Sequence, residues 1–293
     1  MDRRTFLSGL ALTLCAGCAT HSNEPAVGSK NFTEQLILGE ILKQSVENAC
    51  HTQVGGRFYL AGTYICQQAI LAGRIDTYVE YTGTALAAIL KQKAAGDPAK
   101  VYDFVRAQYK QRFNLEVMPP LGFNNSFALV MRPDDARRLS VTNLSQLAPV
   151  APQLRLGVGY EFLERQDGYP GLVRTYGLRF AEAPRVMDLG LLYRALENKS
   201  VDIVAGNNTD GLIAALNLVV VADDKHYFPP YDAVPVVRPA LFAKCPQSRN
   251  ILASLAGRIS ADQMRAMNYA VDGQKKDAAL VAREFLTSNR IGE

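Results

Sequence analysis

Short apolar runs alternate with longer segments of helical spacing along almost the whole of this 293-residue chain. Residues 75–80 are predicted to form a strand, whereas residues 36–46 place their apolar side chains at helical intervals. Strands that alternate with helices favour helices packed against largely parallel sheets. The sequence therefore predicts an α/β protein.

The alternation falls into two blocks, and loops with paired prolines lie between them, at residues 119–120 and 229–230. A domain of about 150 residues is a common size, which makes two domains a reasonable expectation for this length. We expect two lobes between which the chain crosses twice. Residues 26–123 and 228–293 would form lobe 1, and residues 124–227 would form lobe 2.

The composition excludes several classes of protein. Hydrophobic residues make up 48% and charged residues 20%, as in ordinary globular proteins. The 32 Lys and Arg against 28 Asp and Glu leave a formal charge of +4, a small and dispersed surplus that argues against a nucleic-acid partner. No apolar run reaches the ~18 residues of a membrane-spanning helix. We expect contact with a membrane only through a lipid anchor.

Residues 1–18 have the order of an export signal, with two adjacent arginines, Arg3 and Arg4, before a short apolar stretch. This start resembles a bacterial twin-arginine signal. The small residues before Cys18 resemble a lipoprotein box, although Cys15 stands where such boxes usually carry Leu. We predict export, a lipid on Cys18 and a polar tether over residues 19–25, with the protein in the periplasm or on the outer face of the membrane. Ordinary cleavage nearby is the alternative.

Export makes disulfides possible, and three cysteines follow the signal, at Cys50, Cys66 and Cys245. Because three is an odd number, one stays free if two pair. Cys66 lies within an apolar helical pattern, which favours a buried thiol, while the pairing of the three stays open. The chain shows no Cys or His spacing typical of a metal site, and we expect no cofactor.

Four turns are rich in small polar residues and fit the place where α/β proteins bind ligands, beyond the carboxyl ends of strands. They span residues 29–33, 81–84, 159–162 and 207–210. Helix N-termini in such turns suit a carboxylate, because their backbone N–H groups are unpaired and the helix dipole is positive there. Helix capping alone would explain the same small polar residues.

Two helix starts carry a capping signature. Asn31 with Glu34 precedes the helix predicted over residues 36–46, and Ser260 with Gln263 precedes a helix near the C-terminus. We expect the side chains of each pair to bond the backbone of the helix start.

Aromatic side chains fall in or next to the same turns and crossing loops, at Phe32, Tyr81, Phe127, Phe162 and Tyr231. Rings around a cleft can hold a quaternary ammonium group, because their negative faces attract a cation that lacks hydrogen-bond donors. Core packing would also explain an isolated ring beside a turn.

The run VGSKNFTEQLILGE over residues 27–40 closely resembles the opening of the substrate-binding proteins of osmoprotectant ABC transporters, the glycine betaine, carnitine and choline-binding type. Further runs match in family order, and the resemblance extends over roughly residues 27–288. These runs are residues 62–66, 75–84, 121–125, 161–165, 167–172, 209–211 and 223–232.

The resemblance implies a type II periplasmic-binding fold, in which two α/β lobes joined by two crossing strands close on the ligand like a hinge. Its ligands carry a trimethylammonium group and usually a carboxylate. The resemblance also implies a monomer that performs no covalent chemistry and delivers the ligand to separate permease and ATPase subunits.

By position, the resemblance places Gln35 and the turn around Asn31 at the ligand's polar end, and Tyr81 and Tyr231 in the ammonium cage. Thr84 lies where members vary with ligand preference. The full set of predicted ligand contacts is Ser29, Asn31, Phe32, Gln35, Thr63, Tyr81, Thr84, Asn124, Asn125, Phe127, Glu161, Phe162, Asn207, Thr209, Asp210 and Tyr231.

The chain departs from the family pattern at two predicted cage positions, where many members carry Tyr and this chain carries Phe127 and Asn207. A phenylalanine still offers a ring face, whereas an asparagine does not. A lost cation–π contact weakens ammonium binding by about 0.5–2 kcal/mol. Asn207 could instead bond a more polar or larger ligand, such as a betaine with an imidazole ring (for example ergothioneine).

Two other functions fit the same scaffold. One is an enzyme with Glu161 and Asp210 as an acid–base pair, but the chain has no nucleophile elbow or phosphate loop to support it. The other is a sensor that signals to a membrane partner. We expect the transport function.

Overall fold

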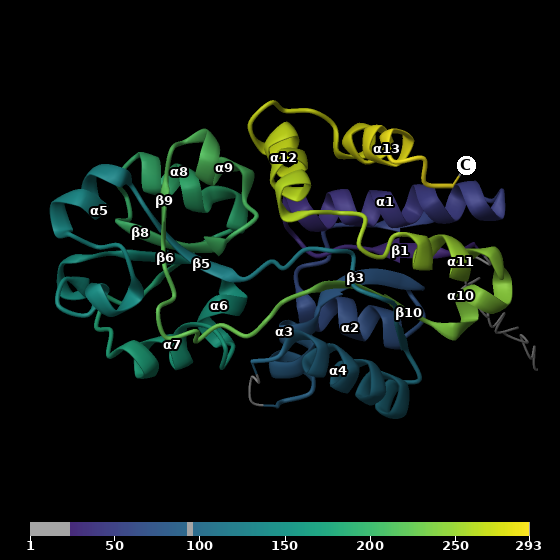
Figure 1. Cartoon of the computed structure of the whole chain (residues 1–293), viewed down its shortest axis with the longest axis horizontal. Coiled ribbons are helices and arrows are strands. Elements are labelled where there is room, and N and C mark those ends of the chain that lie inside the picture. Colours follow the sequence, from purple (N-terminus) through teal and green to yellow (C-terminus); the bar gives the residue numbers. More distant parts are fainter. Residues whose placement is uncertain (1–23, 93–95, 293) are drawn as a thin grey trace, which may run out of the picture.

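The computed structural model describes residues 24–92 and 96–292, and in it the chain forms two lobes, each built on a five-stranded sheet (Figure 1). The predicted two-lobed α/β fold is confirmed. The predicted signal over residues 1–18 and its Cys18 lie outside the described residues. Of the predicted tether, the structure describes residues 24 and 25.

The sheet of lobe 1 has the strand order β2-β1-β3-β10-β4. Strands β3 and β10 are buried along their whole length, so helices cover both faces of the sheet's centre. The strands are β1 (Ala26–Gly28), β2 (Gly55–Arg57), β3 (Thr77–Tyr81), β4 (Glu116–Val117) and β10 (Ala233–Val237).

The sheet of lobe 2 has the order β7-β6-β8-β5-β9. Strand β6 and the first four residues of β8 are buried, which fits their apolar composition. The strands are β5 (Phe127–Met131), β6 (Leu156–Val158), β7 (Arg185–Val186), β8 (Ile203–Asn207) and β9 (Val219–Val221).

Both sheets are mixed, and in this detail they differ from the largely parallel sheets that the sequence predicts. Strand β10 runs antiparallel to β3 and β4, and β5 runs antiparallel to β8 and β9. These are the strands by which the chain enters a lobe from the other one, so they begin at the cleft, where the neighbouring strands β3 and β8 end.

The two segments that connect the lobes lie side by side and bond each other. Asn124 and Asp232 form an isolated antiparallel bridge, and the Asn125 N–H donates to the Tyr231 carbonyl at 3.0 Å. Figure 1 shows the two segments crossing between the lobes, one into β5 and the other into β10. A paired connection of this kind lets two lobes rotate about a narrow hinge.

The helices of lobe 1 cover both faces of its sheet (Figure 1). Helices α1 and α11 to α13 share one apolar core with β1 and β10, and α2 and α4 share another on the opposite face. The helices are α1 (Thr33–Cys50), α2 (Thr63–Leu71), α3 (Thr82–Thr84), a π-helical turn (Ala85–Ile89), α4 (Pro98–Phe113), α10 (Pro239–Lys244), α11 (Gln247–Ser254), α12 (Ala261–Asp272) and α13 (Ala278–Ser288).

One of the two predicted capping boxes is confirmed and the other is wrong. Ser260 and Gln263 cap α12 reciprocally. Helix α1 instead begins after Phe32 with no side-chain cap, and the Glu34 side chain points into the protein, where four side chains bond it. Because the Glu34 side chain is buried, it does not cap the start of the helix.

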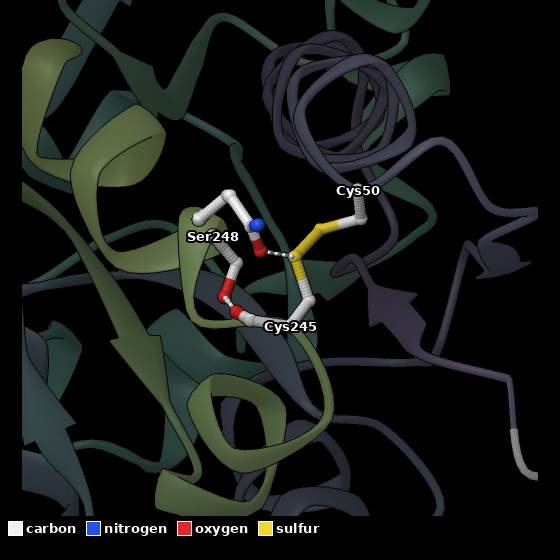
Figure 2. Close-up of a disulfide and its surroundings, with 4 residues drawn as sticks. Cys50, Cys245 and Ser248 are labelled. Atoms are coloured by element: carbon white, nitrogen blue, oxygen red, sulfur yellow. Dashed lines mark hydrogen bonds between the residues drawn. A yellow bond between two sulfur atoms is a disulfide. The ribbon is translucent and has the colours of Figure 1, made fainter.

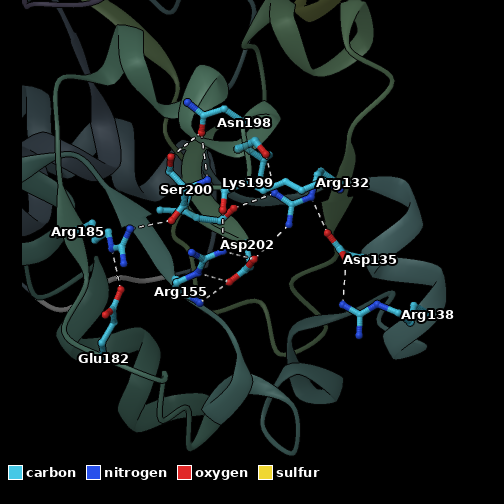
Figure 3. Close-up of polar contacts among 12 residues, drawn as sticks. Arg132, Asp135, Arg138, Arg155, Glu182, Arg185, Asn198, Lys199, Ser200 and Asp202 are labelled. Carbon is cyan, nitrogen blue, oxygen red and sulfur yellow. Dashed lines mark hydrogen bonds and ion pairs between the residues drawn. The ribbon is translucent and has the colours of Figure 1, made fainter.

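Lobe 2 has shorter helices, and an ionic network ties its sheet together at the end away from the cleft (Figure 3). Arg155 donates to the Asp202 carboxylate at 2.9 Å, and Arg132 donates to it at 3.2 Å. Burial opposes the charge of Asp202, but these bonds lower its pKa to about 2. The helices are α5 (Pro133–Leu139), α6 (Tyr160–Glu164), α7 (Tyr169–Tyr176), α8 (Leu192–Glu197) and α9 (Gly211–Ala215), with 3-10 turns at Leu144–Leu147, Ala151–Gln153 and Leu189–Leu191.

A disulfide joins Cys50 at the end of α1 to Cys245 after α10, 195 residues later (Figure 2). The Ser248 hydroxyl donates to the Cys245 carbonyl and braces the turn. Cys66 is the free cysteine among the described residues and is buried, as the sequence predicts. The bridge therefore ties together two parts of lobe 1 that are separated in sequence by all of lobe 2.

Candidate ligand-binding site

A cavity of about 770 Å³ lies between the lobes, at the ends of both sheets that face the cleft. Strand pairing brings its walls together, because Phe127 pairs with Asn207 and Tyr81 pairs with Ala233 at these ends. Lobe 1 contributes chiefly the β1–α1 turn, the start of α2 and the end of β3. Lobe 2 contributes the turn into α6, the segment around the 3-10 turn Leu189–Leu191 and the end of β8. The position is typical of ligand sites in α/β proteins.

Aromatic rings cover much of the wall. Phe32 and Tyr81 are stacked, with ring centroids 6.4 Å apart and an angle of 22° between the planes. Phe127 meets Phe162 edge to face at 4.9 Å and Tyr231 at 5.7 Å. These rings, from both lobes and the crossing segments, therefore line one cavity, and their faces suit a quaternary ammonium group.

Arg165 is one of two cationic side chains of this wall that the predicted contacts did not include. It is 4% exposed, and its guanidinium lies 5.0 Å from the Phe127 ring centroid and 3.1 Å from the Thr84 hydroxyl. Burial opposes its charge, but the Asp167 carboxylate beside it prevails and raises the pKa of Arg165. The cation is therefore permanent, and it lies beside a ring that the sequence assigns to the ligand.

Lys30 is the second such cation and lies in the β1–α1 turn. It is 3% exposed, pairs with the buried Glu80 carboxylate, and lies 5.0 Å from the Tyr81 ring centroid. The wall thus carries two cations, each beside an aromatic ring. Either cation can donate a charge-assisted hydrogen bond to a ligand carboxylate.

Glu161 bridges the two lobes at the edge of the cavity. Its carboxylate accepts from the Thr63 backbone N–H, at the first residue of α2, and from the Thr63 hydroxyl at 3.0 Å. A carboxylate at a helix N-terminus is favoured by both the free N–H groups and the helix dipole. This contact joins the two lobes across the cleft.

Glu34 bridges the lobes behind the cavity and is 2% exposed. Its carboxylate accepts from Tyr81 and Asn125 on one oxygen, and from Thr209 and Asn268 on the other. Burial raises the pKa of Glu34, and the four donors act in the opposite direction. Because Thr209 belongs to lobe 2, this group couples lobe closure to the cavity wall at Tyr81.

Most of the predicted contacts meet in the cavity. They come from both lobes and from both crossing segments. The lining residues among them are Asn31, Phe32, Tyr81, Thr84, Asn125, Phe127, Glu161, Phe162, Asn207 and Tyr231.

The other predicted contacts lie outside the wall of this cavity. Ser29 and Gln35 are buried and bond the backbone of the β1–α1 turn or of Tyr59. Thr63 holds Glu161, and Asn124 pairs with the returning segment at Asp232. Their polar groups serve the turn, the closed cleft and the hinge.

Thr209 and Asp210 also lie outside this wall. The Thr209 hydroxyl donates to Glu34 at 2.6 Å. Asp210 accepts from the Tyr193 hydroxyl at 2.6 Å and from the Asn207 N–H at 2.8 Å, and burial raises its pKa to about 6. Its carboxylate faces a smaller, adjoining pocket.

A signal for the two missed cations is present in the sequence. Lys30 lies inside a polar turn before a helix, and Arg165 lies four residues after Glu161. The carboxylates that neutralise them, Glu80 and Asp167, are also close to cavity residues in sequence. A charged residue next to a predicted ligand contact is the pattern that identifies them.

The described residues show neither a metal site nor a membrane-spanning helix. Across residues 24–92 and 96–292, no group of three or more His, Cys, Asp or Glu side chains is arranged to hold a metal ion. In the same ranges, none of the helices has the length and apolar character needed to cross a bilayer.

Residues 26–288 match the family of substrate-binding domains of ABC-type glycine betaine transport systems. A carnitine transport binding protein of Listeria monocytogenes is 33% identical over 290 residues, which is 98% of this chain and 93% of that protein. An ergothioneine transport permease and binding protein of Helicobacter pylori is 34% identical over 289 residues, 98% of this chain and 51% of that longer protein.

A solved structure has the same two-lobed fold. It is titled as a glycine betaine/carnitine/choline ABC transporter, is 31% identical, and has a TM-score of 0.75 over 92% of this chain and 100% of that chain. A choline-binding protein solved with choline shows the fold alone, at 12% identity and a TM-score of 0.65. It covers 92% of this chain and 89% of that one.

Proposed function

The chain belongs to the family of substrate-binding domains of ABC-type glycine betaine transport systems, and from this premise we propose that it binds a betaine in the cavity between its lobes. It is a substrate-binding protein of an ABC importer of the glycine betaine, carnitine and choline type. Such proteins work outside the cytoplasm and hand a small molecule to permease and ATPase subunits.

The observation that supports a betaine as the ligand is that ring faces and fixed cations alternate on one wall. Lys30 lies 5.0 Å from the Tyr81 ring, and Arg165 lies 5.0 Å from the Phe127 ring. A betaine carries an ammonium and a carboxylate on one small molecule, so it needs a ring face and a cation close together. The wall can therefore hold both charges of one zwitterion at the same time.

In this proposal the rings receive the trimethylammonium group, with Tyr81 and Tyr231 as the principal faces. The carboxylate accepts from Lys30, from Arg165 and from the Thr84 hydroxyl, which already bonds Arg165 at 3.1 Å. Both cations have anionic partners, so an empty cavity leaves neither charge unpaired. This arrangement is organised before the ligand arrives, which favours tight binding.

Closure of the lobes completes the site. Glu161 with Thr63 and Glu34 with Thr209 join the lobes on two sides of the cavity. A ligand that contacts both lobes binds the closed form better than the open one and shifts the population toward it. The closed form is the shape that the permease would receive.

We propose no covalent step for this site. The two carboxylates considered as an acid–base pair serve other purposes, since Glu161 holds the start of α2 and Asp210 accepts from Tyr193 and Asn207. We also propose that Cys18 carries the lipid anchor and that the protein acts as a monomer. Radiolabelled palmitate incorporation that is lost in Cys18→Ala would test the anchor.

The proposed function is tested by calorimetric titration of the purified, ligand-stripped protein with glycine betaine, carnitine, choline and unmethylated glycine. The test variant is Arg165→Met combined with Asp167→Asn, which removes the cation without leaving a buried carboxylate unpaired. The control is Arg174→Met on the surface of α7.

We expect the methylated compounds to bind and glycine not to bind. The double variant should weaken the binding of glycine betaine at least about tenfold more than the binding of choline, because choline has no carboxylate. One charge-assisted contact is worth about 1.5–3 kcal/mol. If no methylated compound binds, the proposed function is wrong. If the variant weakens choline and glycine betaine equally, the role given to Arg165 is wrong.

A further inference from the structure

The cavity between the lobes is larger than a simple betaine needs. Its volume is about 770 Å³, which is within the range of pockets that enclose drug-sized ligands. Glycine betaine has eight non-hydrogen atoms, and even at the ~30 Å³ that a water molecule takes in the liquid, these atoms need only about 240 Å³. More than half of the space therefore lies beyond a glycine betaine bound against the rings and cations.

The cavity has two ends of different chemistry. The inner end holds Lys30, Tyr81, Arg165 and Tyr231, which are all buried. The other end, here called the outer chamber, has a lining of apolar side chains that are exposed or half-buried, so it opens to solvent. These lining residues are Tyr64, Ile65, Tyr160, Val186, Met187 and Leu189.

Both lobes contribute to the outer chamber. Tyr64 and Ile65 follow Thr63 in the first turn of α2, and Tyr160 precedes Glu161 in α6. Because Glu161 accepts from Thr63 across the cleft, these side chains belong to walls that face each other. A chain that lies in the outer chamber is thus covered from two sides.

The carboxylates near the outer chamber already have donors. Glu161 accepts from Thr63, and Asp188 accepts from the Gly190 N–H at 2.9 Å. The two cations of the described lining belong to the inner end. Single exposed apolar side chains are common, but several around one opening are typical of a binding site. The outer chamber therefore suits an apolar substituent better than a charged one.

The inner end decides where such a substituent leaves a betaine. The rings receive the ammonium group and the cations receive the carboxylate, so both charged groups are held at this end. A further substituent can then extend only from the carbon that joins the two charged groups. Because the inner end is filled, a chain on this carbon extends into the outer chamber.

We propose that the ligand is a betaine with a short apolar chain on the carbon between its ammonium and its carboxylate, and that this chain lies in the outer chamber. The proposal rests on the proposed function, since it keeps both charged groups at the inner end. It identifies the ligand more closely, as a zwitterion whose affinity depends in part on apolar burial.

Three ligands test the proposal by calorimetry. N,N,N-trimethylnorleucine adds a butyl chain to glycine betaine, and N,N,N-trimethylglutamine adds a polar chain of similar length. The test variant combines Ile65→Ser with Val186→Ser, one from each lobe, whose side chains are 50% and 48% exposed. The control variant combines Leu280→Ser with Val220→Ser, also one from each lobe, which are 43% and 41% exposed and lie outside the cavity lining.

The expected gain follows from the burial of the chain. Burying one methylene fully strengthens binding about fourfold. Because the outer chamber is open on one side, we take about twofold for each carbon and expect trimethylnorleucine to bind at least about tenfold more tightly than glycine betaine. Trimethylglutamine should bind within about threefold of glycine betaine.

The test variant should reduce the gain of trimethylnorleucine below about threefold and leave the affinity for glycine betaine within about twofold. The control variant should keep the gain. The outer-chamber proposal is overturned by equal affinities for trimethylnorleucine and glycine betaine, by an equal gain for trimethylglutamine, or by a gain that the test variant keeps or the control variant loses. If none of the three ligands binds, the proposed function itself is overturned.

Discussion

Replacing Glu161 by glutamine should weaken ligand binding without changing which ligand is preferred. Glu161 accepts from both donors of Thr63, across the cleft and at the start of α2. A glutamine of the same shape keeps one acceptor and turns its amide group toward the other donor. One charge-assisted hydrogen bond is then lost, together with the attraction between the carboxylate and the helix dipole.

The size of the effect follows from the exposure of the contact. The Glu161 side chain is 25% exposed, so we take the lower end of the range for a hydrogen bond to a charged group, about 1.5 kcal/mol. The dipole adds about 0.5 kcal/mol at a surface position. The sum of about 2 kcal/mol corresponds to a dissociation constant about 30-fold weaker. In the open form water bonds residue 161 in place of Thr63. The substitution therefore destabilises only the closed, liganded form.

Calorimetric titration with glycine betaine and with choline measures this loss, and small-angle scattering follows the compaction that ligand causes. Glu164→Gln is the matched control, since Glu164 lies on the same helix and is exposed. Both ligands should lose affinity by the same factor, because the contact joins lobe to lobe. A change below about threefold for both, or a loss confined to one ligand, would show that Glu161 does not act through closure.

Two further predictions concern stability. Replacing Cys50 and Cys245 by serine opens a loop of 195 residues and should lower the free energy of unfolding by about 5 kcal/mol on chain-entropy grounds, measured by urea denaturation with Cys66→Ala as the control. Unchanged stability would show that the bridge constrains nothing. Burial raises the pKa of Asp210 to about 6, so its protonated form is favoured in the folded state. Relative to Asp210→Asn, the free energy of unfolding should fall by about 3 kcal/mol as the pH rises from about 3 to about 7. If the free energies of unfolding of the two proteins change with pH in parallel, this assignment is contradicted.

Much of the fold follows from local sequence patterns. The helical spacing of apolar residues along α1 and the capping box of Ser260 with Gln263 each depend on residues a few positions apart. The aromatic side chains in the turns also reach the cavity where the pattern places them, among them Phe32, Tyr81 and Phe162. Such features need only the periodicity of one element and the place where it ends.

The sequence does less well where a side chain's role depends on a distant partner. Glu34 has the spacing of a capping residue with Asn31, yet four donors from other parts of the chain draw it into the interior. Arg165 lies in a run that the sequence singles out, but its position in the wall depends on Asp167 and Thr84. Asp167 is two residues from Arg165, but nothing within a few residues of either position reveals Thr84 or the four donors to Glu34.

By itself, then, the sequence determines the alternation of strands and helices, the two-lobed fold and the polar and aromatic character of the cleft. Only the tertiary structure decides that Cys50 pairs with Cys245, that two buried cations lie beside the rings, and that Thr209 and Gln35 face away from the main cavity. The physical reason is one of range. Backbone periodicity and capping act over a few residues, whereas burial, ion pairing and cavity shape depend on which distant segments pack together.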